Sequence, residues 1–280
     1  MVHTGPFGNI AHGTSSVISH NMGTRLADYV VNEAGFAADL GAEKYFDIVM
    51  RNSGIQPAAA VLVTTVQSLR AQGEGHLDAG LGNLAHHIRT LRAFGVPIVV
   101  AINWFPNDTS AELELIAAEC NRQETPWSRV EAFSKGGAGC VDLAQKVVDL
   151  IEANSSPDVQ PAYALEDSLE DKIVKVATQV YGADGVNFSD KARAKLEEYS
   201  RWGYGRLPVC IAKTQYSLTD NPKVMGAPTG WTLQVNDASL SAGAGFVVAI
   251  SGSMMLMPGL PNHPRAMDID LDPGGDVIGV

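Results

Sequence analysis

The chain has 280 residues, 45% of them apolar, and so can bury the core of one large or two medium globular domains. Its 31 acidic and 20 basic residues give a formal charge of -11 at pH 7, which repels phosphate backbones and anionic lipid surfaces. We therefore expect neither nucleic acid nor a membrane as a partner.

The cysteines and the N-terminus indicate a reducing compartment. Cys120, Cys140 and Cys210 match neither a zinc spacing nor a disulfide framework, so we expect three buried thiols. The histidines follow no metal-ligand spacing, and no metal site is expected. The first residues have neither a basic stretch nor an apolar one, so the expected location is the cytoplasm.

The first part of the chain alternates strand and helix patterns. Residues 59–66 and 97–103 are nearly all apolar, as in strands buried on both faces, and helical spacing separates them. A helix follows Asp108, with Thr109 or Ser110 as its N-cap. These patterns predict an α/β fold with a mostly parallel sheet covered by helices.

The remaining elements are predicted in the same way. We expect a strand at 130–133, a strand at 208–212, and helices at 140–153, 169–181 and 189–202. From residue 230 onward, short strands alternate with turns and no helical pattern lies between them.

Polar and aromatic residues follow the second predicted strand in the sequence A-I-N-W-F-P-N-D. In parallel sheets, ligands bind at the carboxyl ends of the strands. The residues expected there are Asn103, Trp104, Phe105, Asn107 and Asp108. Aromatic faces beside hydrogen-bonding groups suit a flat heterocycle such as a pterin or a purine. The alternative is that Phe105 packs beneath its own loop.

A glycine-rich stretch, A-F-S-K-G-G-A-G at residues 132–139, precedes a predicted helix. Its backbone N–H groups can approach an anion, and Lys135 adds a positive charge. A solvent-exposed turn has the same composition, so this pattern alone does not decide between the two. Neither G-x-x-x-x-G-K-[ST] nor a G-x-G-x-x-G that opens a helix occurs in the sequence.

Several long strings together resemble the formate–tetrahydrofolate ligase (formyltetrahydrofolate synthetase) family. They occur in the family's order over nearly the whole chain: H-T-G-P-F-G-N-I-A-H-G (3–13), L-A-D-Y-V-V-N-E-A-G-F-A-A-D-L-G-A-E-K (26–44), F-G-V-P-I-V-V-A-I-N-W-F-P-N-D (94–108), V-Y-G-A-D-G-V (180–186), L-P-V-C-I-A-K-T-Q-Y-S (207–217) and M-P-G-L-P (257–261).

The resemblance implies an ATP-dependent ligase that makes 10-formyltetrahydrofolate through formyl phosphate, with ATP, Mg²⁺, formate and tetrahydrofolate as substrates. It aligns this chain with the C-terminal half of the family, whose P-loop lies in the other half. The implied domains are the end of a P-loop-NTPase-like domain at 1–108, a folate-side α/β domain at 109–218 and a β-rich domain at 219–280.

The same resemblance implies site residues. Phe105 and Phe133 match the pair that stacks on the pterin, and Asn103 and Lys135 belong to the same folate site. Tryptophan is common in the family where this chain has Phe133. The residues that match the cleft for nucleotide and formyl phosphate are Phe7, Gly8, Asn9, Gln67 and Pro106.

Two features put the catalytic function of the chain by itself in question. Gln67 stands where the family has an arginine, so a permanently charged bidentate donor is lost. The family's P-loop lysine and its catalytic arginine match no position in this chain.

Four hypotheses follow: a half-enzyme completed by a second chain that carries the P-loop, a ligase active without one, a non-catalytic folate-binding module, and a structural subunit. The half-enzyme agrees best with the residues. A homo- or hetero-oligomer is expected.

Overall fold

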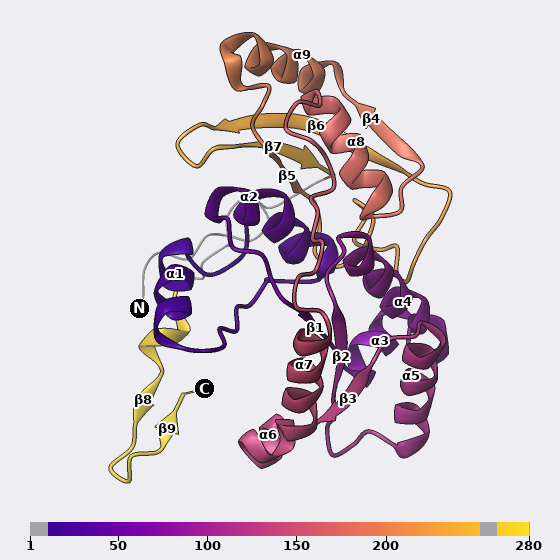
Figure 1. Ribbon diagram of the computed structural model, residues 1–280, viewed down its shortest axis with the longest axis vertical. Helices are drawn as coiled ribbons and strands as arrows, with labels where there is room; N and C mark the ends of the chain where they lie inside the picture. The colour runs from indigo at the N-terminus through magenta and orange to yellow at the C-terminus, as the bar shows by residue number, and fades with distance from the viewer. Residues whose placement is uncertain (1–10, 253–261, 280) are drawn as a thin grey trace.

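The computed structural model describes residues 11–252 and 262–279, which form an α/β fold with two main sheets (Figure 1). The first sheet contains β1 (Ala60–Thr64), β2 (Ile98–Asn103) and β3 (Trp127–Val130), in that order and all parallel. The prediction of a parallel sheet covered by helices is therefore confirmed for this part of the chain.

Helices cover both faces of this sheet where β2 and β3 lie. The helices are α3 (Val66–Gln72), α4 (Leu77–Ala93), α5 (Ser110–Arg122) and α7 (Val141–Ala153), whereas the short α6 (Ala132–Lys135) has no buried residue. On one face, Ile98, Val100 and Ile102 join the main core with residues of α4 and α5. On the other face, Ser128 donates a hydrogen bond to Asp142 of α7 over 2.6 Å. The strand β2 is therefore buried almost throughout, as its apolar sequence predicts.

The strand β1 lies at the edge of the sheet, and one of its faces is bare. Val61 is 42% exposed and Val63 62% exposed, although both are apolar and lie in a strand. Ala60 N donates to Pro97 O over 2.8 Å, so by alternation the backbone groups of Val61 and Val63 point away from β2. Among the described residues, no strand pairs with this outer edge.

The expected strand at 130–133 is wrong. The strand β3 lies earlier because its pairing with β2 runs from Val100 opposite Trp127 to Asn103 opposite Val130, where β2 ends. Residues beyond Val130 have no strand beside them, and the chain turns into α6.

The second sheet is mixed and has the order β4-β6-β7-β5. Its strands are β4 (Gly185–Phe188), β5 (Val209–Ala212), β6 (Thr232–Ser241) and β7 (Phe246–Ser251), with α8 (Leu169–Gln179) and α9 (Asp190–Tyr199) beside them (Figure 1). The strand β4 was not predicted. It runs parallel to β6, whereas β6 runs antiparallel to β7.

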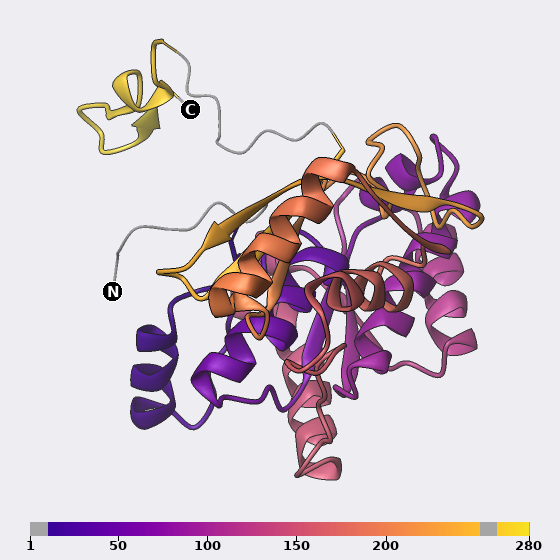
Figure 2. The ribbon, with the colours of Figure 1, turned by 90° about the horizontal axis from the view of Figure 1, so that it is seen from above.

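The end of the described chain forms a small hairpin of β8 (Asp270–Leu271) and β9 (Val277–Ile278). Figure 2 shows this hairpin standing clear of both main sheets. Its apolar residues are largely exposed, including Leu271 and Val277.

The segment before β1 was not predicted to be helical. It contains α1 (Val17–Leu26), two π-helical turns (Ala38–Ala42 and Tyr45–Val49) and α2 (Met50–Ser53). The π-helical turns are buried and carry charged side chains into the interior. Asp39 forms an ion pair with Lys213, which follows β5, over 2.7 Å. This pair therefore connects the turn before the first sheet to a strand end of the second.

Cys120 and Cys210 are buried as predicted, whereas Cys140 is only partly buried, and all three are free thiols. No helix in the described ranges is long and apolar enough to cross a membrane.

Two neighbouring carboxyl groups, Glu43 and Asp47, are completely buried one helical turn apart. Burial raises the pKa of Asp47 to about 7, and burial together with the adjacent Asp47 raises the pKa of Glu43 well above its ordinary value. Lys44 and Arg51 oppose this shift without cancelling it. The raised pKa of Glu43 favours its protonated form, which carries no charge into the interior.

We predict that Glu43→Gln changes the pH dependence of stability. A raised pKa means that the folded chain holds its proton more tightly than the unfolded chain, so this stabilisation is complete below the ordinary pKa and is lost as pH rises. Glutamine cannot lose a proton. From pH 5 to pH 8, the wild-type chain should therefore lose stability relative to the variant, by up to about 1.4 kcal/mol per pH unit.

Urea unfolding at several pH values measures this difference. Glu114→Gln, which removes an exposed carboxylate from α5, is the matched control and should follow the wild-type profile. Parallel profiles for wild type and Glu43→Gln would contradict a proton that Glu43 holds more tightly in the folded chain.

Candidate functional site

The carboxyl ends of β1, β2 and β3 form one edge of the first sheet, where two loops lie side by side. Asn103 at the end of β2 is opposite Val130 at the end of β3, and Trp104 N donates to Val130 O over 2.8 Å. The loop after β2 (residues 104–109) and the segment after β3 (residues 131–139) therefore leave the sheet together. Ligands of parallel α/β sheets bind at such an edge.

Local hydrogen bonds fix the loop after β2. Phe105 N donates to Asp108 Oδ2 over 2.9 Å, which closes a tight turn around Pro106. Thr109 then caps α5 in a reciprocal capping box with Glu112. Phe105 is 36% exposed, so its ring is only partly covered by the loop, and Pro106 is exposed.

The segment after β3 presents a second phenyl ring. Phe133 lies on α6 and is 90% exposed, and Glu131 N donates to Gly139 O over 3.1 Å to close the segment at its base. Lys135 is exposed as well, and its Nζ lies 2.8 Å from Glu131 Oε2. The glycines of this segment lie in the 3-10 turn Gly136–Cys140, which connects α6 to α7.

Gln67 lies at the same edge because α3 begins directly after β1. Thr65 caps α3 through Ser68, and Gln67 is exposed in the first turn. An ion pair of 2.5 Å between Arg70 and Glu112 joins α3 to the start of α5. The structure therefore places Asn103, Phe105, Pro106, Phe133, Lys135 and Gln67 around one sheet edge. Phe7, Gly8 and Asn9 lie outside the described residues.

The contact between the Arg129 guanidinium and the Trp104 ring was not predicted from the sequence. The guanidinium carbon of Arg129 lies 4.4 Å from the centroid of the Trp104 ring, and Arg129 Nη2 lies 3.1 Å from Glu131 Oε1. Their sequence positions gave no signal because the pairing of β2 with β3, rather than sequence distance, brings them together.

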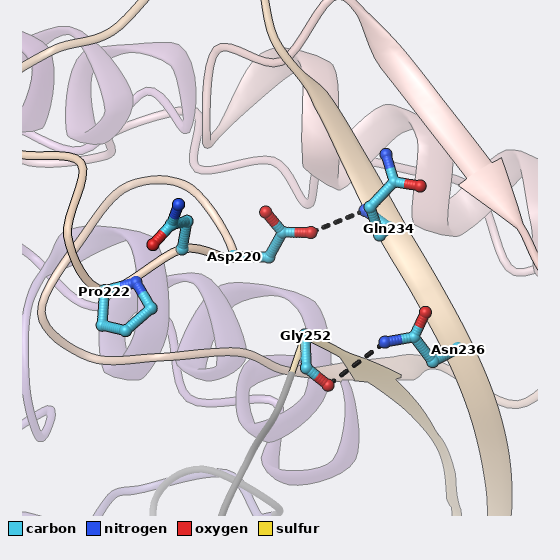
Figure 3. A pocket seen from close by; sticks show the side chains of 6 residues that line it. Asp220, Pro222, Gln234, Asn236 and Gly252 are labelled. Carbon is cyan, nitrogen blue, oxygen red and sulfur yellow. Dashed lines mark hydrogen bonds between the residues drawn. The ribbon is translucent and has the colours of Figure 1, made fainter.

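A separate polar hollow of about 430 Å³ lies on the second sheet (Figure 3). Several of its polar groups hold the strand ends in place: Gln234 N donates to Asp220 Oδ2 over 2.8 Å, and Asn236 Nδ2 donates to Gly252 O over 3.2 Å. None of the predicted site residues lines this hollow.

Within the described ranges, no group of three or more histidine, cysteine, aspartate or glutamate side chains could hold a metal ion. The histidines His86 and His87 are neighbours, with ring centroids 5.9 Å apart and planes nearly perpendicular, but only His87 is fully buried. At the sheet edge, the exposed side chains of Phe105, Phe133 and Lys135 could stack on a ligand or bind an anion.

The family profile of formate–tetrahydrofolate ligase matches residues 1–280. The chain belongs to the formate–tetrahydrofolate ligase family. A formate–tetrahydrofolate ligase from Symbiobacterium thermophilum is 47% identical over 292 residues, which cover 100% of this chain and 52% of that relative. The chain therefore spans about half the length of the curated ligase that it matches.

The cap that ends the Phe105 loop is open to a direct test. Replacing Thr109 with alanine removes a side-chain acceptor for the N–H of Glu112 and should lower the free energy of unfolding by about 1 kcal/mol. Chemical denaturation measures the change. Ser110→Ala, one residue further into α5, is the control and should be nearly neutral; equal effects would contradict the assignment of Thr109 as the cap.

Proposed function

We propose that this chain supplies the tetrahydrofolate site of a formate–tetrahydrofolate ligase, which converts ATP, formate and tetrahydrofolate to 10-formyltetrahydrofolate. One observation carries the proposal: in a chain of this family, two exposed phenyl rings, Phe105 and Phe133, lie on adjacent loops at the carboxyl edge of a parallel sheet.

Stacking is the chemistry that these rings can provide. Phe105 and Phe133 offer apolar faces to a flat pterin, and aromatic pairs of this kind contribute about 0.5–1.5 kcal/mol beyond the area that they bury. Asn103, at the end of β2, adds an amide that can donate to and accept from the heterocycle. Phenylalanine at position 133 has less area than tryptophan and no N–H, so it should bind the pterin more weakly.

The nucleotide and formyl phosphate belong, in this proposal, to the side of the same edge where Gln67 and Pro106 lie. The role proposed for Phe7, Gly8 and Asn9 rests on the family resemblance alone. Gln67 has no charge to offer a phosphate, and the sequence contains no P-loop motif. ATP and Mg²⁺ therefore require groups from a further polypeptide segment. The location proposed for the complete enzyme is the cytoplasm.

That segment is proposed to pair with the unpaired edge of β1. Val61 and Val63 combine exposed apolar side chains with outward-pointing backbone groups, which is the usual template for another strand. In this arrangement residues 1–108 complete a P-loop-NTPase-like domain, and residues 109–218 and 219–280 form the two smaller domains. The partner is a polypeptide that contains the rest of the family's sequence, and the assembly is a homo- or hetero-oligomer.

A second function has support from one observation. The sequence contains the groups proposed to bind folate but no P-loop motif, so a non-catalytic folate-binding module would use the same edge. Formation of 10-formyltetrahydrofolate and ADP by the chain, measured with and without the remaining part of the Symbiobacterium ligase, separates the two functions. Turnover only in the mixture supports the half-enzyme; folate binding without turnover in either case supports the module.

Phe105→Ala should weaken tetrahydrofolate binding to the chain by about 1–3 kcal/mol because the stacking surface is lost. Isothermal titration calorimetry measures the dissociation constant. Leu115→Ala, which removes an exposed apolar side chain from α5, is the control and should leave binding unchanged. An unaltered dissociation constant in Phe105→Ala would remove Phe105 from the site.

Val63→Lys should prevent association of the chain with the complementary part of the Symbiobacterium ligase, because a charge would be buried at the joined strand edge. Analytical ultracentrifugation of the mixture measures complex formation. Leu115→Lys adds the same charge elsewhere and should associate as the wild type does. A Val63→Lys chain that still forms the complex would show that the segment does not bind at the edge of β1.

A further inference from the structure

One carboxylate bridges two cations at the rim of the proposed folate site. Glu131 Oε1 lies 3.1 Å from Arg129 Nη2, and Glu131 Oε2 lies 2.8 Å from Lys135 Nζ. The hydrogen bond from Lys135 and the charge of Arg129 lower the pKa of Glu131, so this side chain is a carboxylate at neutral pH. The two cations therefore lie close enough together for one carboxylate group to pair with both.

Arg129 is held in place by more than this ion pair. Its guanidinium group packs on the ring of Trp104, 4.4 Å from the ring centroid, and Trp104 is anchored through its backbone N–H to Val130 O. A planar guanidinium fixed on an aromatic face loses little freedom when it binds an anion. Arg129 is thus oriented for a carboxylate before any ligand arrives.

Both cations are close in sequence to the proposed stacking rings. Trp104, under Arg129, directly precedes Phe105, and Lys135 follows Phe133 by two residues on α6. A ligand whose flat ring lies on these phenyl groups therefore extends along a rim where cations are available.

Tetrahydrofolate carries a glutamate arm whose carboxylates are ionised at neutral pH. We propose that Arg129 and Lys135 bind a glutamate carboxylate of tetrahydrofolate, and that Glu131 occupies this position until the ligand displaces it. This inference rests on the proposed folate site and adds the groups that select the anionic arm. Arg129 and Lys135 are specificity-determining residues and take no part in formyl transfer.

The structural alternative is a surface ion-pair network with no ligand. All three side chains are at least partly exposed, and exposed ion pairs contribute little to stability. The two interpretations differ in what Glu131 does. If Glu131 competes with the ligand, its removal strengthens binding; if it only pairs with its neighbours, its removal has no effect on the ligand.

The test compares two ligands on the 280-residue chain: tetrahydrofolate and tetrahydropteroate, which has the same rings without the glutamate. Titration calorimetry at low and high salt gives the dissociation constants. Arg129→Gln and Lys135→Gln should each weaken tetrahydrofolate binding by about tenfold, as expected for a lost charge-assisted hydrogen bond, and leave tetrahydropteroate binding unchanged. Glu131→Gln should strengthen tetrahydrofolate binding by severalfold.

Lys146→Gln is the matched control, because Lys146 forms a similar surface ion pair, with Asp142 over 2.7 Å, on α7. It should bind both ligands as the wild type does. Arg129→Lys keeps the charge but loses the planar fork, and should give an intermediate loss.

Failure of the inference and failure of the folate site give different results. If both ligands bind the wild-type chain equally and the variants change nothing, the glutamate-binding role of Arg129 and Lys135 is overturned while the folate site stands. If neither ligand binds the wild-type chain, the folate site itself is overturned and the inference with it. Equal weakening of both ligands by Arg129→Gln would show that Arg129 shapes the ring site, which also overturns the proposal.

Discussion

The parallel pairing of β2 with β3 is the interaction on which the candidate site depends. It sets Asn103 opposite Val130 and extends one step further through the hydrogen bond from Trp104 N to Val130 O. Because both strands run in the same direction, both following segments emerge at one edge. For this reason the loop of Phe105 and the segment with Glu131, Phe133 and Lys135 leave the sheet side by side.

Buried charge connects this sheet to the second one. The ion pair between Asp39 and Lys213 is almost fully shielded from water, Glu43 follows the first π-helical turn, and Asp47 lies in the second. Removing one partner of a buried pair is costly because the remaining charge has no partner, so the pair favours contact between the turn that contains Asp39 and the end of β5. π-Helical turns are frequent at functional sites, but here their side chains point into the interior between the sheets.

The sequence predicted the elements whose signal is local. The apolar runs at 59–66 and 97–103 became β1 and β2, and the cap at Thr109 begins α5 as expected. The end of β3 was misplaced because it is determined by the length of its neighbour β2. The strand β4 was missed because four residues with mixed exposure carry almost no periodic signal.

The site shows the same division between local and non-local information. Phe105, Asn103 and Lys135 could be found from their positions after predicted strands or before a predicted helix, and Phe133 and Gln67 from the family resemblance. The stacking of Arg129 on Trp104 could not, because strand pairing creates it. Likewise, the exposure of Val61 and Val63 follows from the position of β1 at the sheet edge, whereas their apolar sequence predicts burial.

Hydrogen–deuterium exchange of the chain with and without tetrahydrofolate tests the central claim most directly, because it locates the ligand without assuming any residue. Tetrahydrofolate should slow exchange in residues 103–109 and 131–139 and leave exchange around the hollow of Asp220 and Asn236 unchanged. Protection confined to that hollow, or no protection in either loop, would contradict a folate site at the carboxyl edge of β2 and β3.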